Sequence, residues 1–335
     1  MVTLWPSFPH FPRFAGDMRL SGIRLNSAMM DVAELDTELE LVRTSPAAVP
    51  LYFDVKGRQL RVEEVYPDRD HLDLRLNHPI NVRTPVPVLF KAGADRAMLE
   101  RVEEGGRRLI FHGGPKFMVK AGESLHIRDM SLEVHGDQFS QLELEKIEKV
   151  RRAGFTKYFL SYVETERDVD EFLSLVGRDV EVELKIENKK GLQFVADTFK
   201  KRDNLSLVAA RGDLYVEVDR PHHILDALKL IIAKDPHALV GSRLMLSVVG
   251  APAPEIRQAL AMITEENIDA ETARKILMSV IAQPVPSCAD FCEAAWLYDI
   301  GYRRMMLCDE LCLKEELLVP AVNAFHSFRN SYAKK

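Results

Sequence analysis

The sequence has no apolar run that approaches the roughly 18 residues of a membrane-spanning helix, and it has no basic tail. Its 45 lysines and arginines are spread among 51 acidic residues, for a formal charge of −6. This balance argues against a nucleic-acid partner and against a membrane surface. The first residues are aromatics and prolines where a signal peptide would carry a charged and then an aliphatic segment. We therefore expect a cytoplasmic protein.

Cysteine is also scarce. The four cysteines form two pairs at i,i+4 spacing, Cys288 with Cys292 and Cys308 with Cys312. This spacing is uncommon for a zinc ribbon, and the flanking residues are apolar. The sequence therefore predicts buried free thiols and not a zinc site.

Short apolar runs are plentiful, and most are followed by an amphipathic, helix-like stretch. Alternation of buried strands and helices predicts a parallel sheet, and eight such units close a barrel. We therefore predict an α/β fold of the (β/α)₈ TIM-barrel type. The eight runs are VTLWP, GIRLN, VPLYFDV, KYFLSYV, VEVELKI, LSLVAARG, ALVGSRLML and YRRMMLC.

One stretch, residues 64–137, breaks this rhythm with alternating segments such as HLDLRL and PVPVLF, separated by Pro, Gly and Asp. It predicts a small β-rich insert between strands three and four. We accordingly expect barrel strands 1–3 in residues 1–63, the insert in 64–137, strands 4–8 in 138–325, and a C-terminal tail in 326–335.

Polar residues gather where two of the predicted strands end, which is where a parallel barrel carries its active site. In VEVELKIEN, strand alternation sends Lys185 and Glu187 to the same face. The next strand ends in Arg211, Gly212 and Asp213. Because adjacent strand ends meet, Glu187 and Asp213 could share one Mg²⁺ or Mn²⁺, an ion that completes its shell with water and substrate oxygens.

These segments resemble motifs of the pyruvate kinase family. KIENKKGL and ARGDLYVEV are similar to the family's Lys-Ile-Glu-Asn-x-x-Gly and Ala-Arg-Gly-Asp-Leu-Gly-Val-Glu motifs, in the same order and at the same separation. Four further segments keep the family's order, so the resemblance extends over the whole barrel. They are GIRLNSAMM, LYFDVKGRQLRV, LVGSRLMLS and YRRMMLCDEL.

The resemblance implies a catalytic group and a metal site. Lys185 would neutralise the transferring phosphoryl group and the enolate oxygen, and Glu187 and Asp213 would hold Mg²⁺ or Mn²⁺. Arg24 and Arg61 match the family's phosphate-contacting arginines, whose forked donors suit a phosphate or a carboxylate. The structural alternative for both arginines is a salt bridge on the barrel rim.

The substrate-binding set implied by the resemblance is Arg24, Asn26, Gly212, Asp213 and Ser242. The amides of Gly212 and Asp213 would hold the substrate carboxylate, and the hydroxyl of Ser242, which stands where the family has Thr, would assist as part of the catalytic set. The alternative for Ser242 is a helix cap.

The sequence also departs from the family. Asn26 and Asp54 remain from its monovalent-cation site, but Ala28 and Val55 replace two oxygen ligands, which argues against a potassium requirement. After the eighth strand only Glu310 keeps the family's register. The insert is shorter than the family's lid domain, and the sequence ends near where its effector domain would begin, so we expect no sugar-phosphate activation.

Three functions remain open. The first is Mg²⁺-dependent phosphoryl transfer between phosphoenolpyruvate and an acceptor such as ADP. The second is metal-dependent aldolase or lyase chemistry on a 2-oxo acid, which uses the same enolate site without a nucleotide. The third is a catalytically silent regulatory barrel. A homodimer is the expected assembly.

Overall fold

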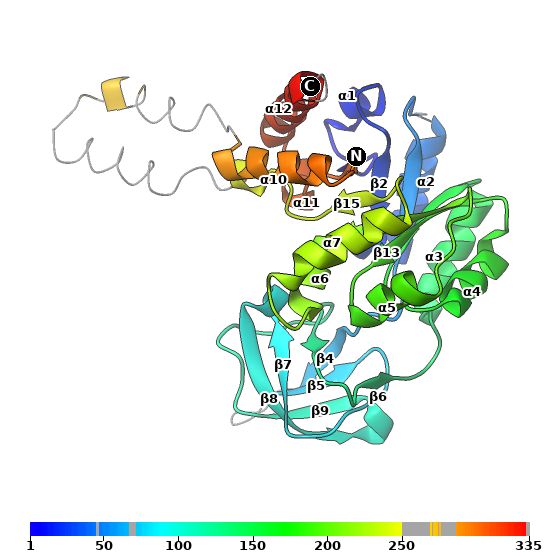
Figure 1. Ribbon diagram of the computed structural model, residues 1–335. Coiled ribbons are helices and arrows are strands. Elements are labelled where there is room, and N and C mark those ends of the chain that lie inside the picture. The colour runs from blue at the N-terminus through cyan, green and yellow to red at the C-terminus, as the bar shows by residue number, and fades with distance from the viewer. Residues whose placement is uncertain are drawn as a thin grey trace.

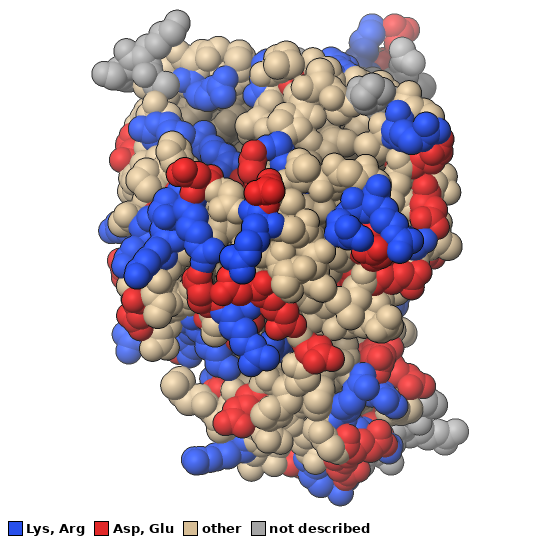
Figure 2. Space-filling model, turned by 90° about the vertical axis from the view of Figure 1, so that its right-hand side faces the viewer, with Lys and Arg blue, Asp and Glu red and all other residues tan. Residues whose placement is uncertain are grey.

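The structure is a computed structural model that describes residues 1–44, 47–66, 72–249, 269, 271–273, 275 and 286–332. A parallel sheet forms the larger part of it, with helices outside and a second, β-rich part at one end (Figure 1). Within the described residues, every helix is too short or too polar to cross a membrane. Charges of both signs are interspersed over the face in Figure 2.

Eight parallel strands follow one another around the sheet in chain order. The backbone of Met1 links the two edge strands, since its nitrogen donates to Met305 O at 2.7 Å and its carbonyl accepts from Leu307 N at 3.0 Å. The predicted barrel is thereby confirmed. Its strands are β1 (Val2–Thr3), β2 (Ile23–Asn26), β3 (Leu51–Val55), β12 (Lys157–Leu160), β13 (Glu181–Ile186), β14 (Leu205–Ala210), β15 (Leu239–Gly241) and β16 (Arg304–Met305).

Helices pack their apolar faces on the outside of the barrel. In α4, Thr165 and Asp168 form a capping box, and Val169, Phe172 and Leu173 are buried at helical spacing. The α-helices are α1 (Phe11–Ala15), α2 (Val32–Thr44), α3 (Gln141–Arg152), α4 (Glu166–Val176), α5 (Lys189–Asp197), α6 (Arg211–Glu217), α7 (His223–Lys234), α10 (Cys288–Asp299), α11 (Asp309–Cys312) and α12 (Glu315–Tyr332). Short 3₁₀ turns are η1 (Ser27–Met29), η2 (Lys91–Gly93), η3 (Glu104–Gly106) and η4 (Leu246–Val248).

The interior of the barrel has an apolar floor that includes Tyr52, Phe159, Val208 and Met306. Because strand side chains alternate, the residue two positions after a floor residue points inward nearer the carboxyl end. In β3 this residue is Asp54, which lies two positions after Tyr52. Polar groups thus sit directly above an apolar layer.

The insert between β3 and β12 has its own core, centred on Leu74, Val88, Phe90 and Phe111. It confirms the predicted β-rich insert. A six-stranded antiparallel sheet has the order β10-β7-β8-β9-β5-β4, and β6 pairs with β11. The strands are β4 (Val62–Tyr66), β5 (Asp73–Leu76), β6 (Ile80–Asn81), β7 (Val86–Phe90), β8 (Asp95–Glu103), β9 (Arg108–His112), β10 (His126–Ile127) and β11 (Glu133–Val134).

Two local features differ from the sequence predictions. Helix α12 continues through Tyr332, so residues 326–332 are helical where a tail was predicted, and 333–335 lie outside the described residues. Cys308 and Cys312 are buried as predicted, whereas Cys288 and Cys292 are exposed on the first turns of α10. Apolar flanks bury one cysteine pair only, because α10 turns the other pair outward.

Candidate active site

A cavity of about 450 Å³ lies between the carboxyl ends of the barrel strands and the insert, and we call it the first cavity. The insert side contributes Gln59, Arg61 and Ser124 to its lining. Asp54 is fully buried beneath it. The structure brings the other predicted site residues together around this cavity: Arg24, Asn26, Arg61, Lys185, Glu187, Gly212, Asp213 and Ser242.

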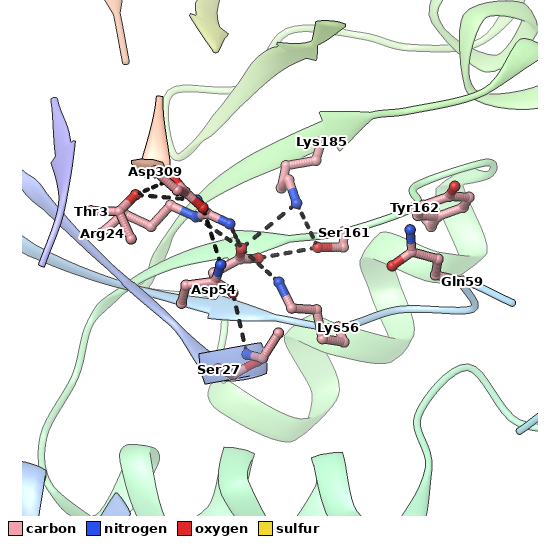
Figure 3. Close-up of polar contacts among 12 residues, drawn as sticks. Thr3, Arg24, Ser27, Asp54, Lys56, Gln59, Ser161, Tyr162, Lys185 and Asp309 are labelled. Carbon is pink, nitrogen blue, oxygen red and sulfur yellow. Dashed lines mark hydrogen bonds and ion pairs between the residues drawn. The ribbon is translucent and has the colours of Figure 1, made fainter. Parts of the chain in front are cut away.

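Asp54 is the centre of a charged cluster under the first cavity (Figure 3). Its carboxylate accepts hydrogen bonds from Arg24 Nε at 2.9 Å, Lys56 Nζ at 2.9 Å and Ser161 Oγ at 3.1 Å. Lys185 Nζ lies 3.6 Å away. Burial alone would raise the pKa of Asp54, but Lys185, Lys56 and Arg24 outweigh it and hold the pKa well below its usual range.

Lys185 remains an ammonium group in this cluster. Its Nζ lies 2.9 Å from Glu187 Oε1 and donates to Ser161 Oγ at 2.9 Å. Burial opposes its charge, but Asp54 and Glu187 outweigh burial and raise the pKa of Lys185. The predicted same-face placement of Lys185 and Glu187 on and just after β13 is therefore present as a direct ion pair.

The two predicted metal ligands interact electrostatically. Burial, and then the like charge of Asp213, raise the pKa of Glu187, while Lys185 lowers it. Glu187 Oε2 accepts from Tyr162 N at 2.7 Å, and Asp213 Oδ1 lies 3.7 Å from His126 Nε2. Two hard carboxylates that repel one another beside open space fit Mg²⁺ or Mn²⁺.

The described residues hold no group of three or more metal-ligating side chains, so such an ion would take most of its shell from water and substrate. Asn26 and Asp54, the remnant of the monovalent-cation site, fit a cation less well than Glu187 and Asp213 do. Asp54 is occupied by cationic groups, while Asn26 Oδ1 accepts from Ala28 N at 3.2 Å and its amide donates to Asp309 at 3.3 Å.

Arg24 is held between two carboxylates. Besides Asp54, its Nη1 lies 3.0 Å from both carboxylate oxygens of Asp309, whose Oδ1 also accepts from Thr3 Oγ1 at 2.8 Å. The salt-bridge alternative for Arg24 is therefore realised. Arg61 lacks a carboxylate partner within the described residues, and it donates to Gly122 O at 2.7 Å and Gln59 Oε1 at 2.5 Å.

Ser242 lies in a strained turn at the end of β15. Its φ of 69° is left-handed, and that of Arg243 is 63°. A Cβ added to Gly212 would lie 3.5 Å from Ser242 Oγ, so the two residues are neighbours, as predicted. Arg211 holds the turn by donating to Gly241 O at 3.2 Å and to Ser242 O. Ser242 is thus part of a braced loop and not a helix cap.

No protein-family model matches the sequence. Two curated relatives are similar to it. The pyruvate kinase of Thermoplasma acidophilum is 28% identical over 288 residues, covering 76% of this chain and 49% of that protein. The pyruvate kinase of Methanocaldococcus jannaschii is 26% identical over 231 residues, covering 65% and 50%. The chain spans about half the length of the curated relatives it matches.

The fold is similar to the crystal structure of pyruvate kinase from Pyrobaculum aerophilum, with a TM-score of 0.66 over 98% of this chain and 71% of that chain, at 16% identity. Both sequence matches and this structural neighbour are pyruvate kinases. In sequence and in fold, this chain is similar to pyruvate kinases.

Sequence reasoning missed four residues of the site. Lys56 and Ser161 could have been found, because Lys56 follows Asp54 by two positions and Ser161 directly follows strand β12. Burial lowers the pKa of Lys56 to about 8, although Asp54 opposes the shift. Asp309 follows the eighth strand, but nothing local signals its contact with Arg24. His126 comes from the insert, whose orientation the sequence does not encode locally.

Proposed function

We propose that this chain catalyses Mg²⁺- or Mn²⁺-dependent phosphoryl transfer of the pyruvate kinase type, with phosphoenolpyruvate or the pyruvate enolate as substrate and ADP or ATP as its partner. The observation that carries the proposal is the position of Lys185. Its ammonium lies 2.9 Å from Glu187 and borders the same cavity as Asp213 and Arg61. Phosphoryl transfer depends on such positioned charge.

The residues around the first cavity would have separate roles in metal binding, charge neutralisation and orientation. Glu187 and Asp213 would hold the divalent ion, which when bound supplies Lewis-acid stabilisation of substrate oxygens. Lys185 neutralises charge that develops on the enolate oxygen and the phosphoryl group. Asp54 and Ser161 fix the direction of its ammonium, because both contact Nζ or its hydrogen-bond partner.

Substrate anions would be recognised from two sides of the first cavity. The first-turn amides of Gly212 and Asp213 have no acceptor within α6 and are available to a carboxylate, with Ser242 Oγ beside them. Arg61 faces the cavity from the insert side without a counter-ion among the described residues. We therefore assign phosphate recognition to Arg61 and treat Arg24 as a group that positions Asp54.

One observation favours the second candidate, a metal-dependent aldolase or lyase acting on a 2-oxo acid. Asp309 binds the part of the Arg24 guanidinium that Asp54 leaves open. This contact lowers the affinity of Arg24 for a phosphate. An enolate without a phosphoryl group would need only Lys185, the metal and the amides at α6.

The test is to incubate the protein with phosphoenolpyruvate, ADP and Mg²⁺, with and without K⁺, and to record phosphorus and proton NMR spectra. Pyruvate and ATP appearing together support the kinase. Solvent exchange of the pyruvate methyl protons without phosphate transfer supports the enolate-only enzyme. If neither occurs, and if Mg²⁺ with oxalate does not raise the melting temperature, the proposed site is wrong.

A further inference from the structure

A second cavity, of about 340 Å³, lies between the insert and the barrel on the other side of a thin wall. The segment 58–61, whose side chains line both cavities, forms this wall. Its alternate side chains face opposite ways, since Gln59 and Arg61 line the first cavity whereas Arg58 and Leu60 line the second. Tyr162, held at a left-handed φ of 55°, completes the wall and also lines the second cavity.

The lining of the second cavity is amphipathic. Its barrel side is built around the first turn of α5, where Asn188, Lys189 and Lys190 meet the cavity. Met130, which also lines this cavity, is 92% exposed. The insert side contributes Arg58, His126, Arg128 and Asp129, together with an apolar set that consists of Leu60, Leu125, Ile127, Met130, Leu132 and Val134.

The carboxylates of this lining already have partners. Glu217 bonds His126 Nδ1 at 2.7 Å, and Asp219 pairs with Lys189 at 2.8 Å. Glu164 accepts from Asn188 at 2.6 Å, and burial raises its pKa, which favours its neutral form. Asp129 accepts from Ser131 Oγ at 2.6 Å.

The cationic side chains of the lining have fewer hydrogen-bond and ion-pair partners. Within the described residues, the side chains of Lys190 and Arg128 form no hydrogen bond or close ion pair, although Lys190 interacts electrostatically with Glu164 and Arg128 with Asp219. Arg58 reaches Asp168 only at 3.7 Å, and its buried Nε has no hydrogen-bond partner there. Cationic side chains without a hydrogen-bonded carboxylate therefore lie beside the apolar residues of the insert side.

We propose that the second cavity binds a small amphipathic organic anion. Its apolar body packs against the apolar residues of the insert side, and its anionic head meets Lys190, Arg128 and Arg58. The bound anion would contact Tyr162, whose backbone nitrogen donates to Glu187. It would also contact His126, whose Nε2 lies 3.7 Å from Asp213. Occupancy would thus alter the affinity of the first cavity for the metal; this clause rests on the proposed function.

The binding test uses fluorine NMR with 4-fluorophenyl phosphate as the probe and the full chain as the receptor. We expect saturable binding of this probe, and at least tenfold weaker binding of neutral 4-fluorobenzyl alcohol and of inorganic phosphate. The double variant Lys190→Ala, Arg128→Ala should weaken probe binding at least tenfold, whereas Lys190→Arg should retain it. Both altered side chains are exposed, so folding is preserved.

Two matched variants locate the probe. Lys229→Ala removes an exposed charge from α7 and should leave binding unchanged, as should Arg61→Ala in the first cavity. Equal binding of the neutral analogue, or unchanged binding by the double variant, overturns the proposal. Weakening by Arg61→Ala alone also overturns it, since the probe would then occupy the first cavity. None of these readouts depends on turnover, so failure of the kinase assay leaves them intact.

The coupling is measured separately, from the Mg²⁺ concentration that raises the melting temperature half-maximally, with and without the probe. A shift of twofold or more in the wild-type chain, absent from the double variant, is the expected result. An identical Mg²⁺ midpoint with bound probe would overturn the coupling while leaving the binding site in place.

Discussion

Asp309 binds Arg24 with both carboxylate oxygens, each 3.0 Å from the same guanidinium nitrogen. These residues are 285 positions apart and join the end of the barrel to its second strand. Because Asp54 occupies the other side of the guanidinium, Arg24 has no unshared charge to offer a phosphate. Arg24 is thus engaged by two carboxylates, whereas Arg61 has no carboxylate partner within the described residues.

Removing the charge of Asp309 should restore anion binding at Arg24. Asp309→Asn keeps a side chain that can hydrogen-bond Thr3 and Arg24, and we expect affinity for phosphoenolpyruvate to rise about tenfold, or about 1.4 kcal/mol. Calorimetric titration measures this change. Asp226→Asn on the exposed face of α7 is the control. Unchanged affinity would show that Arg24 lies outside the phosphate site.

Lys185→Met should leave the chain folded and lower turnover by about 10³-fold or more, because it removes the charge that faces the developing enolate and phosphoryl oxygens. Turnover is measured by pyruvate formation and folding by circular dichroism. Lys229→Met serves as the control. Activity comparable to that of the unaltered chain would rule out the assigned role.

Glu187→Gln and Asp213→Asn should each abolish the stabilisation that Mg²⁺ and oxalate confer. In the unaltered chain a ligand at about 100 times its dissociation constant contributes about 2.7 kcal/mol. Thermal unfolding with Mg²⁺ or with EDTA measures the difference, and Glu145→Gln on α3 is the control. If both variants keep the Mg²⁺ response, the ion binds elsewhere.

The insert should lose stability as the pH falls from about 6.5 to about 4. Burial, with help from Arg58 and Arg107, lowers the pKa of His78 to about 4, so between these values the unfolded chain binds a proton that the folded chain refuses. Stability is therefore present above 6.5 and declines below it, by on the order of 2 kcal/mol for this buried histidine. Urea unfolding of His78→Asn should show a shallower pH dependence than that of the unaltered chain, and His112→Asn, at an exposed position of the insert, is the control variant.

Gly57→Ala should disturb the charged cluster around Asp54. An added Cβ would lie 2.2 Å from the carbonyl oxygen of Ser161, whose hydroxyl contacts both Asp54 and Lys185. We expect a loss of about 1–3 kcal/mol in unfolding free energy together with reduced turnover. Gly114→Ala, where the nearest atom lies 4.0 Å away, should cost far less. Equal effects of the two substitutions would contradict this steric account.

Much of the fold could be predicted because its signals are local. Each buried strand is a short apolar run, and strand alternation sufficed to place Lys185 beside Glu187. The extent of α12 was missed because its last turns are mostly polar and gain stability from tertiary packing of Phe325 and Phe328 on the core.

The rest of the site depends on contacts distant in sequence. The pairing of Asp309 with Arg24 requires the barrel to bring its two ends together. His126 reaches Asp213 only because the insert is oriented over the barrel mouth, and Tyr162 adopts a left-handed φ that no residue preference predicts. Local periodicity contains none of this information.

The segment 58–61 also fixes the register on which both cavities depend. A one-residue slip there would turn Arg58 and Leu60 toward the candidate metal ligands and Gln59 and Arg61 toward the apolar residues of the second cavity, exchanging the two linings at once. Insertions and deletions in these four positions should therefore be far more damaging than substitutions. Substitutions at positions 58 and 60 would alter the second cavity, and substitutions at positions 59 and 61 would alter the first.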